Sequence, residues 1–334
     1  MGGALIEWVS WRWIFFINLP LAVLTIALAR AGQCNERRQL RVGRLDLPGA
    51  ALAALAFGTL TYGLVEGQDK GFADVWWSFA VAVPAFAAFC LVELRSREPM
   101  LPFELFRRRN FAMANLETFL VYGALYGQLI FVQLYLQFIG FSPFEAALVT
   151  MPGSAIMIFL AARFGKLADQ QGPRLYLTAG PFLVGIGILL ILPVTERSDF
   201  WTFGIASVIV FALGLAMLVA PITSTALKSA PAELAGIASG VNSTVSRLGN
   251  LLAVAIIGVV VTLVFDSQVA SDTAVPLARG QSDQALRDAS IDGFRSGMLL
   301  AAGLAFAGAA VAAVGIVNRE GAEVSERAPA PAGN

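Results

Sequence analysis

Two charged residues lie well inside long apolar stretches of the sequence and are its first candidates for chemistry. Glu117 follows Phe111 by six residues, about 9 Å along a helix. Arg247 follows Gly236 by eleven residues, about 16 Å. A charge at the centre of a bilayer costs roughly 2.5–3.5 kcal/mol, so such residues are usually functional. A carboxylate removed from water can bind and release protons, while a structural ion pair between Glu117 and Arg247 is the alternative.

Polar side chains form two lines along the segment 111–138. At about 100° per residue, one line holds Asn115, Thr118, Tyr122, Tyr126, Gln133 and Gln137. The other line, on roughly the opposite side, holds Glu117, Gln128 and Tyr135. A helix that faces lipid keeps one side apolar, so two polar lines indicate that one borders a wet cavity while the other packs on neighbours. Aromatic rings and amides suit contact with an amphipathic organic substrate. Hydrogen bonding between helices is an equally good explanation of the same side chains.

A third polar line lies in the segment 234–265. Its members are Ser239, Asn242, Ser243, Ser246 and Asn250. The same segment contains Gly236 and Gly240 in the G-x-x-x-G spacing that lets membrane helices pack closely. Packing is therefore favoured over transport for this line, although Asn242 is kept among the candidate pathway residues.

Composition excludes several classes of protein. Of the 334 residues, 57% are hydrophobic and 14% charged, whereas a soluble domain has about 25% charged residues. The net charge of zero gives no driving force for nucleic-acid binding. Histidine is absent, and Cys34 and Cys90 form no metal-binding cluster. No G-x-x-x-x-G-K-S/T nucleotide-binding loop is present. We therefore expect neither an enzyme nor a resident metal or cofactor.

The elements that must position these residues are membrane helices. A bilayer core about 30 Å thick requires about 20 apolar residues in a helix. Nine stretches qualify: 13–29, 47–65, 75–94, 111–138, 144–164, 175–194, 200–227, 234–265 and 294–317. Lipid leaves backbone polar groups to be satisfied within each segment, so all nine are predicted to be helices. The sequence thus predicts an all-α polytopic membrane protein with the lipid bilayer as its first partner.

The positive-inside rule orients these helices. Alternate connections, together with the C-terminal segment, hold 16 of the 23 Lys and Arg residues, and the other side holds six. The richer side is expected to be cytoplasmic, which places the N-terminus outside and the C-terminus inside. Arg outnumbers Lys by 20 to 3, which hints at a bacterial genome and hence at a bacterial inner (plasma) membrane. The tail 320–334, rich in Ala, Pro and Glu, is predicted to be disordered.

Three motifs occur in a recognisable order. Residues 11–20 contain W-R-W-x-F-x-x-N-x-P and follow Gly2 and Gly3. Residues 165–174 read G-K-L-A-D-Q-Q-G-P-R, and residues 231–242 read P-A-E-L-A-G-I-A-S-G-V-N. Together they resemble the fourteen-helix drug:proton antiporter branch of the major facilitator superfamily. By this resemblance the 165–174 segment is a gating loop, with Gly165 and Gly172 in a tight turn. Asp169 would pair with Arg163 or Arg174, or cap the next helix.

The resemblance also implies a division of the chain. Residues 1–30 would be the remnant of an N-terminal bundle, 31–110 two central helices with their loops, 111–319 an intact C-terminal six-helix bundle and 320–334 a cytoplasmic tail. The expected function is proton-coupled efflux of small amphipathic organic compounds by a partial, N-terminally truncated transporter. Its site residues would be Glu117, Arg247, Asn115, Tyr122, Tyr126, Gln133 and Asn242. The alternative is a non-transporting membrane remnant or interaction module that needs a separate N-terminal half.

Overall fold

The computed structural model describes residues 12, 16, 18–32, 46–96, 103–231, 234–269, 275–280 and 283–318. Within these ranges the chain forms nine α-helices and two short 3-10 helices, without a strand. The α-helices are α3 (Asn18–Gly32), α4 (Leu47–Lys70), α5 (Trp76–Arg95), α6 (Arg109–Phe138), α7 (Pro143–Gln171), α8 (Arg174–Leu189), α9 (Phe203–Lys228), α10 (Ala235–Gln268) and α11 (Gln284–Gly315). The 3-10 helices are η2 (Phe103–Arg107) and η3 (Asp199–Trp201). The predicted all-α class is confirmed.

Each of the nine predicted segments overlaps one helix of the described chain. By length and composition, seven of these helices could cross a membrane, and α3 and α8 are shorter apolar helices. Two boundaries differ from the expectation by more than five residues. The helix α11 begins at Gln284, ten residues before the predicted start, because its first turns are polar outside while Ala289, Ser290 and Ile291 are buried. The helix α7 continues seven residues past its predicted end, through the segment expected to be a loop.

Local sequence signals set several helix ends. The Oδ1 atom of Asp46 accepts a hydrogen bond of 2.9 Å from the amide of Gly49 at the start of α4. At the start of α7, Ser142 and Glu145 each accept a hydrogen bond from the other's backbone amide, which forms a capping box. The same helix ends where Gly172 adopts a φ of +95°, a conformation that favours glycine.

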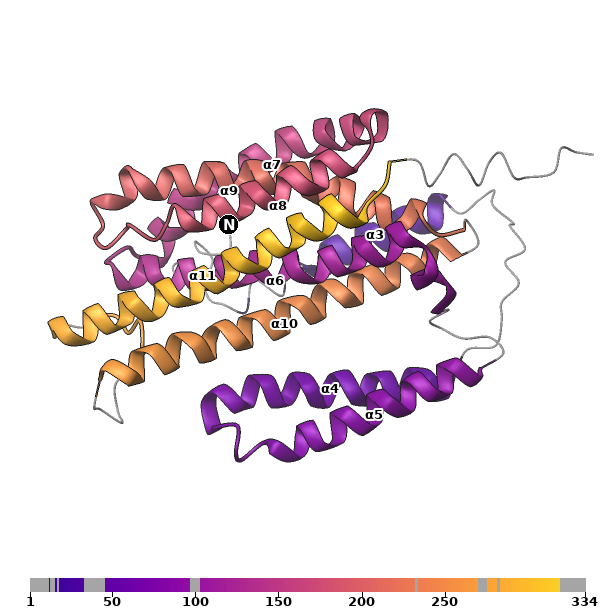
Figure 1. Ribbon diagram of the computed structural model, residues 1–334, viewed down its shortest axis with the longest axis horizontal. Coiled ribbons are helices and arrows are strands. Elements are labelled where there is room, and N and C mark those ends of the chain that lie inside the picture. The colour runs from indigo at the N-terminus through magenta and orange to yellow at the C-terminus, as the bar shows by residue number, and fades with distance from the viewer. Residues whose placement is uncertain are drawn as a thin grey trace, which may run out of the picture.

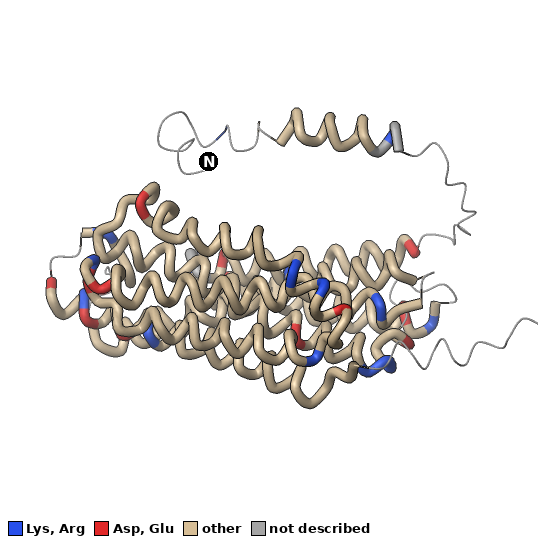
Figure 2. Tube along the Cα trace, turned by 90° about the horizontal axis from the view of Figure 1, so that it is seen from above, with Lys and Arg blue, Asp and Glu red and all other residues tan. Residues whose placement is uncertain are grey.

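The helices α6 to α11 pack together into one bundle (Figure 1). In it, α6 lies against α10 and α11, α8 against α9 and α11, and α7 against α9. The core contains large side chains that are fully buried, among them Tyr135, Ile188 and Ile257. Many charged residues lie toward the two ends of the bundle and a few lie nearer its middle (Figure 2).

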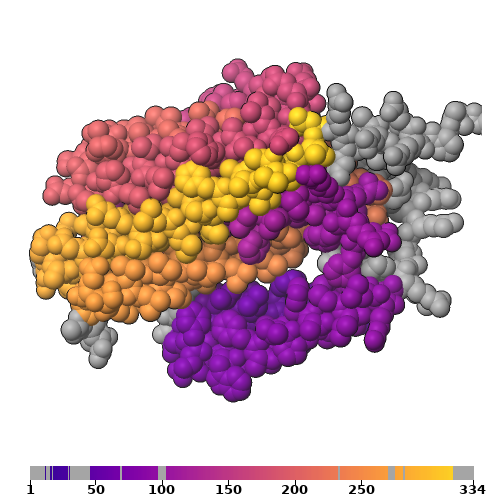
Figure 3. Space-filling model, in the orientation of Figure 1, coloured from indigo at the N-terminus to yellow at the C-terminus, as the bar shows by residue number. Residues whose placement is uncertain are grey.

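The helices α4 and α5 form a hairpin beside this bundle. The hairpin runs below α10 in the view of Figures 1 and 3. Its contact with the bundle is made through α4 and α10. The helix α3 lies apart from the other helices in Figure 2. Most of the predicted 1–30 remnant, including most of the 11–20 motif, and the predicted tail 320–334 lie outside the described residues.

One end of the bundle carries the starts of α6 and α8 and the end of α11; we call it the arginine-rich end. The Nε atom of Arg109 donates to the carbonyl of Gly315 at 2.7 Å, and the Nε atom of Arg174 donates to the carbonyl of Ala313 at 2.9 Å. The side chain of Asn110 bonds both the amide and the carbonyl of Val317. The last carbonyls of α11, which have no partner within their own helix, are thus bound by side chains from α6 and α8.

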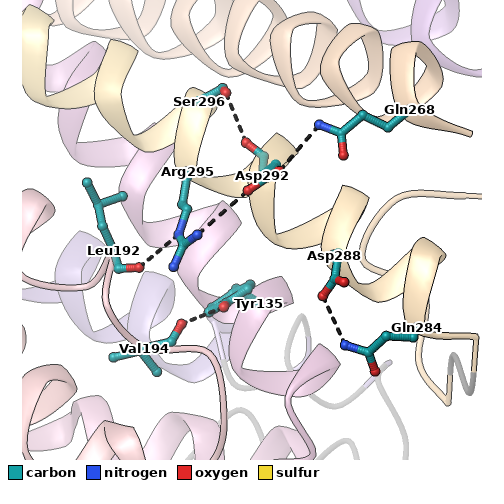
Figure 4. Close-up of polar contacts among 9 residues, drawn as sticks. All are labelled: Tyr135, Leu192, Val194, Gln268, Gln284, Asp288, Asp292, Arg295 and Ser296. Carbon is teal, nitrogen blue, oxygen red and sulfur yellow. Dashed lines mark hydrogen bonds and ion pairs between the residues drawn. The ribbon is translucent and has the colours of Figure 1, made fainter.

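The opposite end is held by the connection between α8 and α9 (Figure 4). There the hydroxyl of Tyr135 donates to the carbonyl of Val194, and Arg295 donates to the carbonyl of Leu192. In the same connection Asp199 accepts hydrogen bonds from the amide and hydroxyl of Thr195 and from the amide of the next residue. These bonds favour the charged form and lower the pKa of Asp199. Their stabilising effect is therefore lost as the pH falls through that lowered pKa.

Candidate functional site

A cavity of about 410 Å³ lies between α6, α7 and α9 and opens to the surface of the bundle beside the exposed side chains of Leu129 and Ile158. It is lined by Gln128, Leu129, Val132, Gln133, Thr150, Gly153, Ser154, Met157, Ile158, Ile191, Ser207, Val208, Phe211, Ala212 and Leu215. Most of these side chains are apolar, and a few amides and hydroxyls stand among them. A cavity of this size and lining is typical of sites for small organic molecules. We call it the mid-bundle cavity.

The polar groups of the mid-bundle cavity differ in how they are bonded. The hydroxyl of Ser207 donates to the carbonyl of Gly187 at 2.7 Å, and that of Thr150 donates to the carbonyl of Ala146 at 3.0 Å. The side chain of Gln128 is 5% exposed, and its Oε1 atom has no hydrogen-bond partner among the described residues. An unpaired buried acceptor is costly. A ligand with a hydrogen-bond donor would satisfy it once the side chain turns toward the cavity, because the Oε1 atom itself is not exposed there.

The predicted pathway residues on α6 are only partly brought together here. Gln133 lines the mid-bundle cavity, whereas Asn115, Tyr122 and Tyr126 are not among its lining residues. Tyr126 is exposed, and Tyr122 is half-buried against an apolar cluster around Val121. Sequence reasoning placed Gln128 on the second polar line and did not assign it to the pathway. The sequence predicts the polar line that contains Gln128, but it does not show that α7 and α9 approach this line.

Asn115 and Asn242 do meet, at the crossing of α6 and α10. The Nδ2 atom of Asn242 donates to Thr118 Oγ1 at 2.9 Å and to Asn115 Oδ1 at 3.3 Å. Thr118 and Asn115 also donate to carbonyls one turn earlier in α6. All three side chains are buried. They therefore bond the two helices to each other, and their role in a pathway stays a prediction.

We expect Asn242→Ala to weaken this crossing. The substitution removes the interhelical donor and leaves the buried acceptors of Asn115 and Thr118 without it, at a cost of about 1 kcal/mol. Unfolding of the purified chain in detergent would measure the loss. Ser239→Ala is the matched control, because Ser239 lies one turn earlier on α10 and is exposed. Equal stability of the two variants would contradict a structural role for the Asn242 bonds.

Glu117 is fully buried, and neither of its carboxylate oxygens has a hydrogen-bond partner among the described residues. It lies where α6 packs on α11, close to Gly308. Arg247 is exposed on α10 and forms no ion pair within the described chain. The pair considered from the sequence is therefore not formed. The reason is geometric: Arg247 lies about 140° around α10 from Asn242, which faces α6.

The effects of Glu117→Gln and Arg247→Gln on stability should consequently add. Side chains that share no contact usually give additive changes in unfolding free energy, to within about 0.3–0.5 kcal/mol. A double-mutant cycle in detergent measures the coupling. A compensating interaction well above that limit would show that the two charges meet after all.

The predicted gating loop is only partly a loop. Gly165 to Gln171 continue α7, so the expected tight turn at Gly165 is wrong, and Gly172 alone has a positive φ. A Cβ atom at Gly172 would also collide with the side chain of Asn318. Glycine is thus required there on two grounds.

The expected partners of Asp169 were also wrong. Asp169 forms an ion pair with Lys228 at the end of α9, at 2.6 Å. Arg163 lies about 120° away around α7, and Arg174 binds α11 instead. The predicted segment thus bonds α7 and α8 to α9 and α11. Asp169, Gly172 and Lys228 line a second cavity of about 670 Å³ at the arginine-rich end, which we call the end cavity. A gating role stays a prediction.

In the described part of the chain, no three His, Cys, Asp or Glu side chains are grouped to hold a metal. The chemistry that the arrangement supports is recognition by an amide in an apolar cavity and proton binding by a buried carboxyl group.

Comparison with known proteins places this arrangement in a family. Residues 1–254 match the Major Facilitator Superfamily. Multidrug resistance protein Stp of Mycobacterium tuberculosis is 32% identical over 267 residues, which are 77% of this chain and 48% of that protein. Tetracenomycin C resistance and export protein of Streptomyces glaucescens is 30% identical, with 78% and 48% covered. Quinolone resistance protein NorB of Staphylococcus aureus is 26% identical, with 79% and 58% covered.

The chain thus spans about half the length of the curated relatives it matches. The match to the superfamily nevertheless covers most of the chain and agrees with the apolar helices and the bundle that they form. This protein belongs to the Major Facilitator Superfamily.

Proposed function

We propose that this chain takes part in proton-coupled export of small amphipathic organic compounds from a bacterium, with the mid-bundle cavity as its substrate site. The single observation that supports the substrate class most is the buried, unpaired Oε1 atom of Gln128 beside a cavity that is lined mostly by apolar side chains. Relatives named for multidrug resistance, for tetracenomycin C resistance and export, and for quinolone resistance support export as the direction.

In this proposal the apolar body of the substrate fills the space beside Phe211 and Val132, and a donor group of the substrate bonds Gln128. Gln133, half-buried in the same lining, offers a second amide. Glu117 binds the proton that is exchanged for substrate. The protein sits in the inner membrane with its arginine-rich end in the cytoplasm, following the positive-inside rule.

The second candidate function is an interaction module that transports only with a separate N-terminal half. The exposed side of α10 favours it, because Arg247 and Ser243 stand there without a protein neighbour covering them, in a helix apolar enough to span a membrane. A charge facing lipid is costly, and a polar helix face from another segment would cover it. Tyr126, which is exposed, and Tyr122, which is half-buried, would then line the contact or pathway between the two halves.

Transport by the chain alone separates the two candidates. The purified full chain would be placed in liposomes with a pH-sensitive dye inside, and a fluorescent quinolone added outside. Substrate-driven proton movement that Glu117→Gln abolishes and Glu145→Gln leaves unchanged would support the first candidate; Glu145 is a partly exposed carboxylate at the opposite end of the bundle. Movement that appears only after an N-terminal bundle from a relative is added would favour the module. Absence of movement in both preparations would contradict both.

A further inference from the structure

The described residues end at the rim of the end cavity. Asn110 of α6 donates to the carbonyl of Val317 at 2.8 Å and accepts a hydrogen bond from its amide at 2.9 Å. The Oδ1 atom of Asn318 accepts a hydrogen bond from the amide of Arg174 at the start of α8. Both Val317 and Asn318 also line the end cavity. The point from which the chain continues beyond Asn318 is therefore fixed at this rim.

The end cavity carries one positive charge in excess. Its charged lining side chains are Arg108, Lys228 and Asp169. Asp169 pairs with Lys228, whereas Arg108 forms no ion pair within the described chain. Arg108 is half-buried, and its Nη1 atom donates to the carbonyl of Ser229 at 3.3 Å. A guanidinium group has five N–H donors in a planar fork that matches a carboxylate, so Arg108 can still bind an anion.

The sequence that follows Asn318 is acidic. Residues 320–326, which we call the acidic segment, read E-G-A-E-V-S-E and contain three Glu and no Lys or Arg. The first of them, Glu320, lies two residues beyond Asn318. Two residues of extended chain span at most about 7 Å. The backbone of Glu320 thus stays near the rim of a cavity that Arg108 also lines.

The covalent attachment strengthens a contact that would be weak between separate molecules. A single exposed ion pair contributes little to binding. A segment on a short tether, however, meets its site at an effective concentration of about millimolar. The half-buried position of Arg108 also reduces the screening of its charge by salt. The composition that predicts disorder for the tail does not oppose the contact, because such a segment can become ordered where it binds.

We propose that the end cavity is the docking site of the chain's own acidic segment, with the carboxylate of Glu320 on Arg108. Docking would connect the chain after α11 to the start of α6 and would cover the cavity at the arginine-rich end. An anionic lipid headgroup and the acidic segment of a second copy are the competing occupants, and the attachment of Glu320 to the rim favours the chain's own segment. The contact is separate from the mid-bundle cavity and does not depend on transport.

Disulfide cross-linking of the full chain tests this docking. Cys34 and Cys90 would first be replaced by serine. Cysteine would then be placed at Ala322, within the acidic segment, and at Ser224, which is half-buried in the lining of the end cavity. The matched control carries Glu104→Cys in place of Ser224→Cys, because Glu104 is exposed just before α6 and does not line the cavity. Oxidation with copper phenanthroline in phosphatidylcholine liposomes would be followed by mass spectrometry of the linked peptides.

We expect the Ser224→Cys and Ala322→Cys pair to form its disulfide at least about tenfold faster than the control pair, because docking raises the local concentration. Replacing Glu320 and Glu323 by glutamine should lower this rate to that of the control. Salt at about 1 M, where the Debye length is about 3 Å, should do the same. Both glutamates follow the last described helix, so their substitution should leave the bundle folded. Equal rates for the two pairs, or a rate that neither treatment changes, would overturn the proposal.

Two further outcomes would assign the end cavity to another occupant and would also overturn the proposal. The first is a disulfide that is lost when phosphatidylglycerol is added to the liposomes, since a lipid phosphate would then displace the acidic segment. The second is a disulfide between two molecules, one with only Ser224→Cys and the other with only Ala322→Cys, at the rate of the double variant. That result would place the acidic segment of a second copy in the cavity.

Discussion

Replacing Gly214 by valine should destabilise the bundle more than any other single substitution considered for this protein. Gly214 lies where α8 and α9 touch backbone to backbone. A Cβ atom added there would lie 2.6 Å from the carbonyl oxygen of Gly180 and 2.7 Å from the amide nitrogen of Val184. These atoms belong to main chain and cannot turn aside as a side chain can. The two helices must therefore separate, and the core side chains beside them lose their close packing.

The expected cost of Gly214→Val is about 3 kcal/mol or more, at the upper end of the range for overpacked cores. Gly303→Val on α11 is the matched control, because Gly303 is exposed and a Cβ atom there meets nothing within 4 Å. The fraction of each variant that stays monodisperse in detergent after heating would measure the difference. If both variants lose the same stability, the α8–α9 contact cannot be as close as described. If Gly214→Ala is also strongly destabilising, the first added carbon already forces the helices apart.

The helical segments could be predicted from the sequence, because a segment in lipid must satisfy its own backbone polar groups and a helix is one of the few structures that can do so. Nine apolar stretches of sufficient length predicted nine helices, and the structure places one on each. The helix ends were harder to predict, since hydropathy indicates which residues lie in the membrane and not where the helix begins or ends. The polar stretch 266–292 was predicted to be either mobile or a short surface helix, yet Gln284 to Asp292 form the first turns of α11 with Ile291 on the buried side.

The contacts between helices could be predicted least. The line of Asn115 and Thr118 was correctly recognised as polar, but its partner Asn242 lies more than a hundred residues away in the sequence. The pairing of Glu117 with Arg247 was wrong because helical periodicity gives only the direction of each side chain around its own helix. It does not tell how the two helices are rotated relative to each other. Gln128 was missed for the same reason. Its line was read correctly, but the approach of α7 and α9 decides what that line faces.

Substituting Gln128 by methionine should lower the affinity for ligand without lowering the stability of the fold. Methionine has nearly the length of glutamine and is apolar, so it fills the same space in the mid-bundle cavity. It also removes an amide oxygen that is buried without a partner. An unpaired buried acceptor costs about 1–3 kcal/mol, so the empty protein should be as stable as the parent or more stable. A residue that merely packs the core would not show this gain.

The affinity for a ligand should change in the opposite direction. An aromatic compound with a secondary ammonium group would donate a charge-assisted hydrogen bond to Gln128, and such a bond contributes about 1.5–3 kcal/mol. Its loss corresponds to a decrease in affinity of roughly tenfold to a hundredfold. Fluorescence titration of the purified chain measures this change. A compound of the same shape without the donor should bind the parent and Gln128→Met equally.

Gln133→Met is the internal comparison for this prediction. Gln133 lines the same cavity but is half-buried, so water can satisfy its amide when no ligand is present. Replacing it should not raise stability, and its effect on affinity should be smaller, because the bond to ligand there only replaces a bond to water. A larger loss of affinity at Gln133 than at Gln128 would move the recognition of the ligand to the rim of the cavity. Unchanged affinity in both variants would leave the cavity without a role in binding that compound.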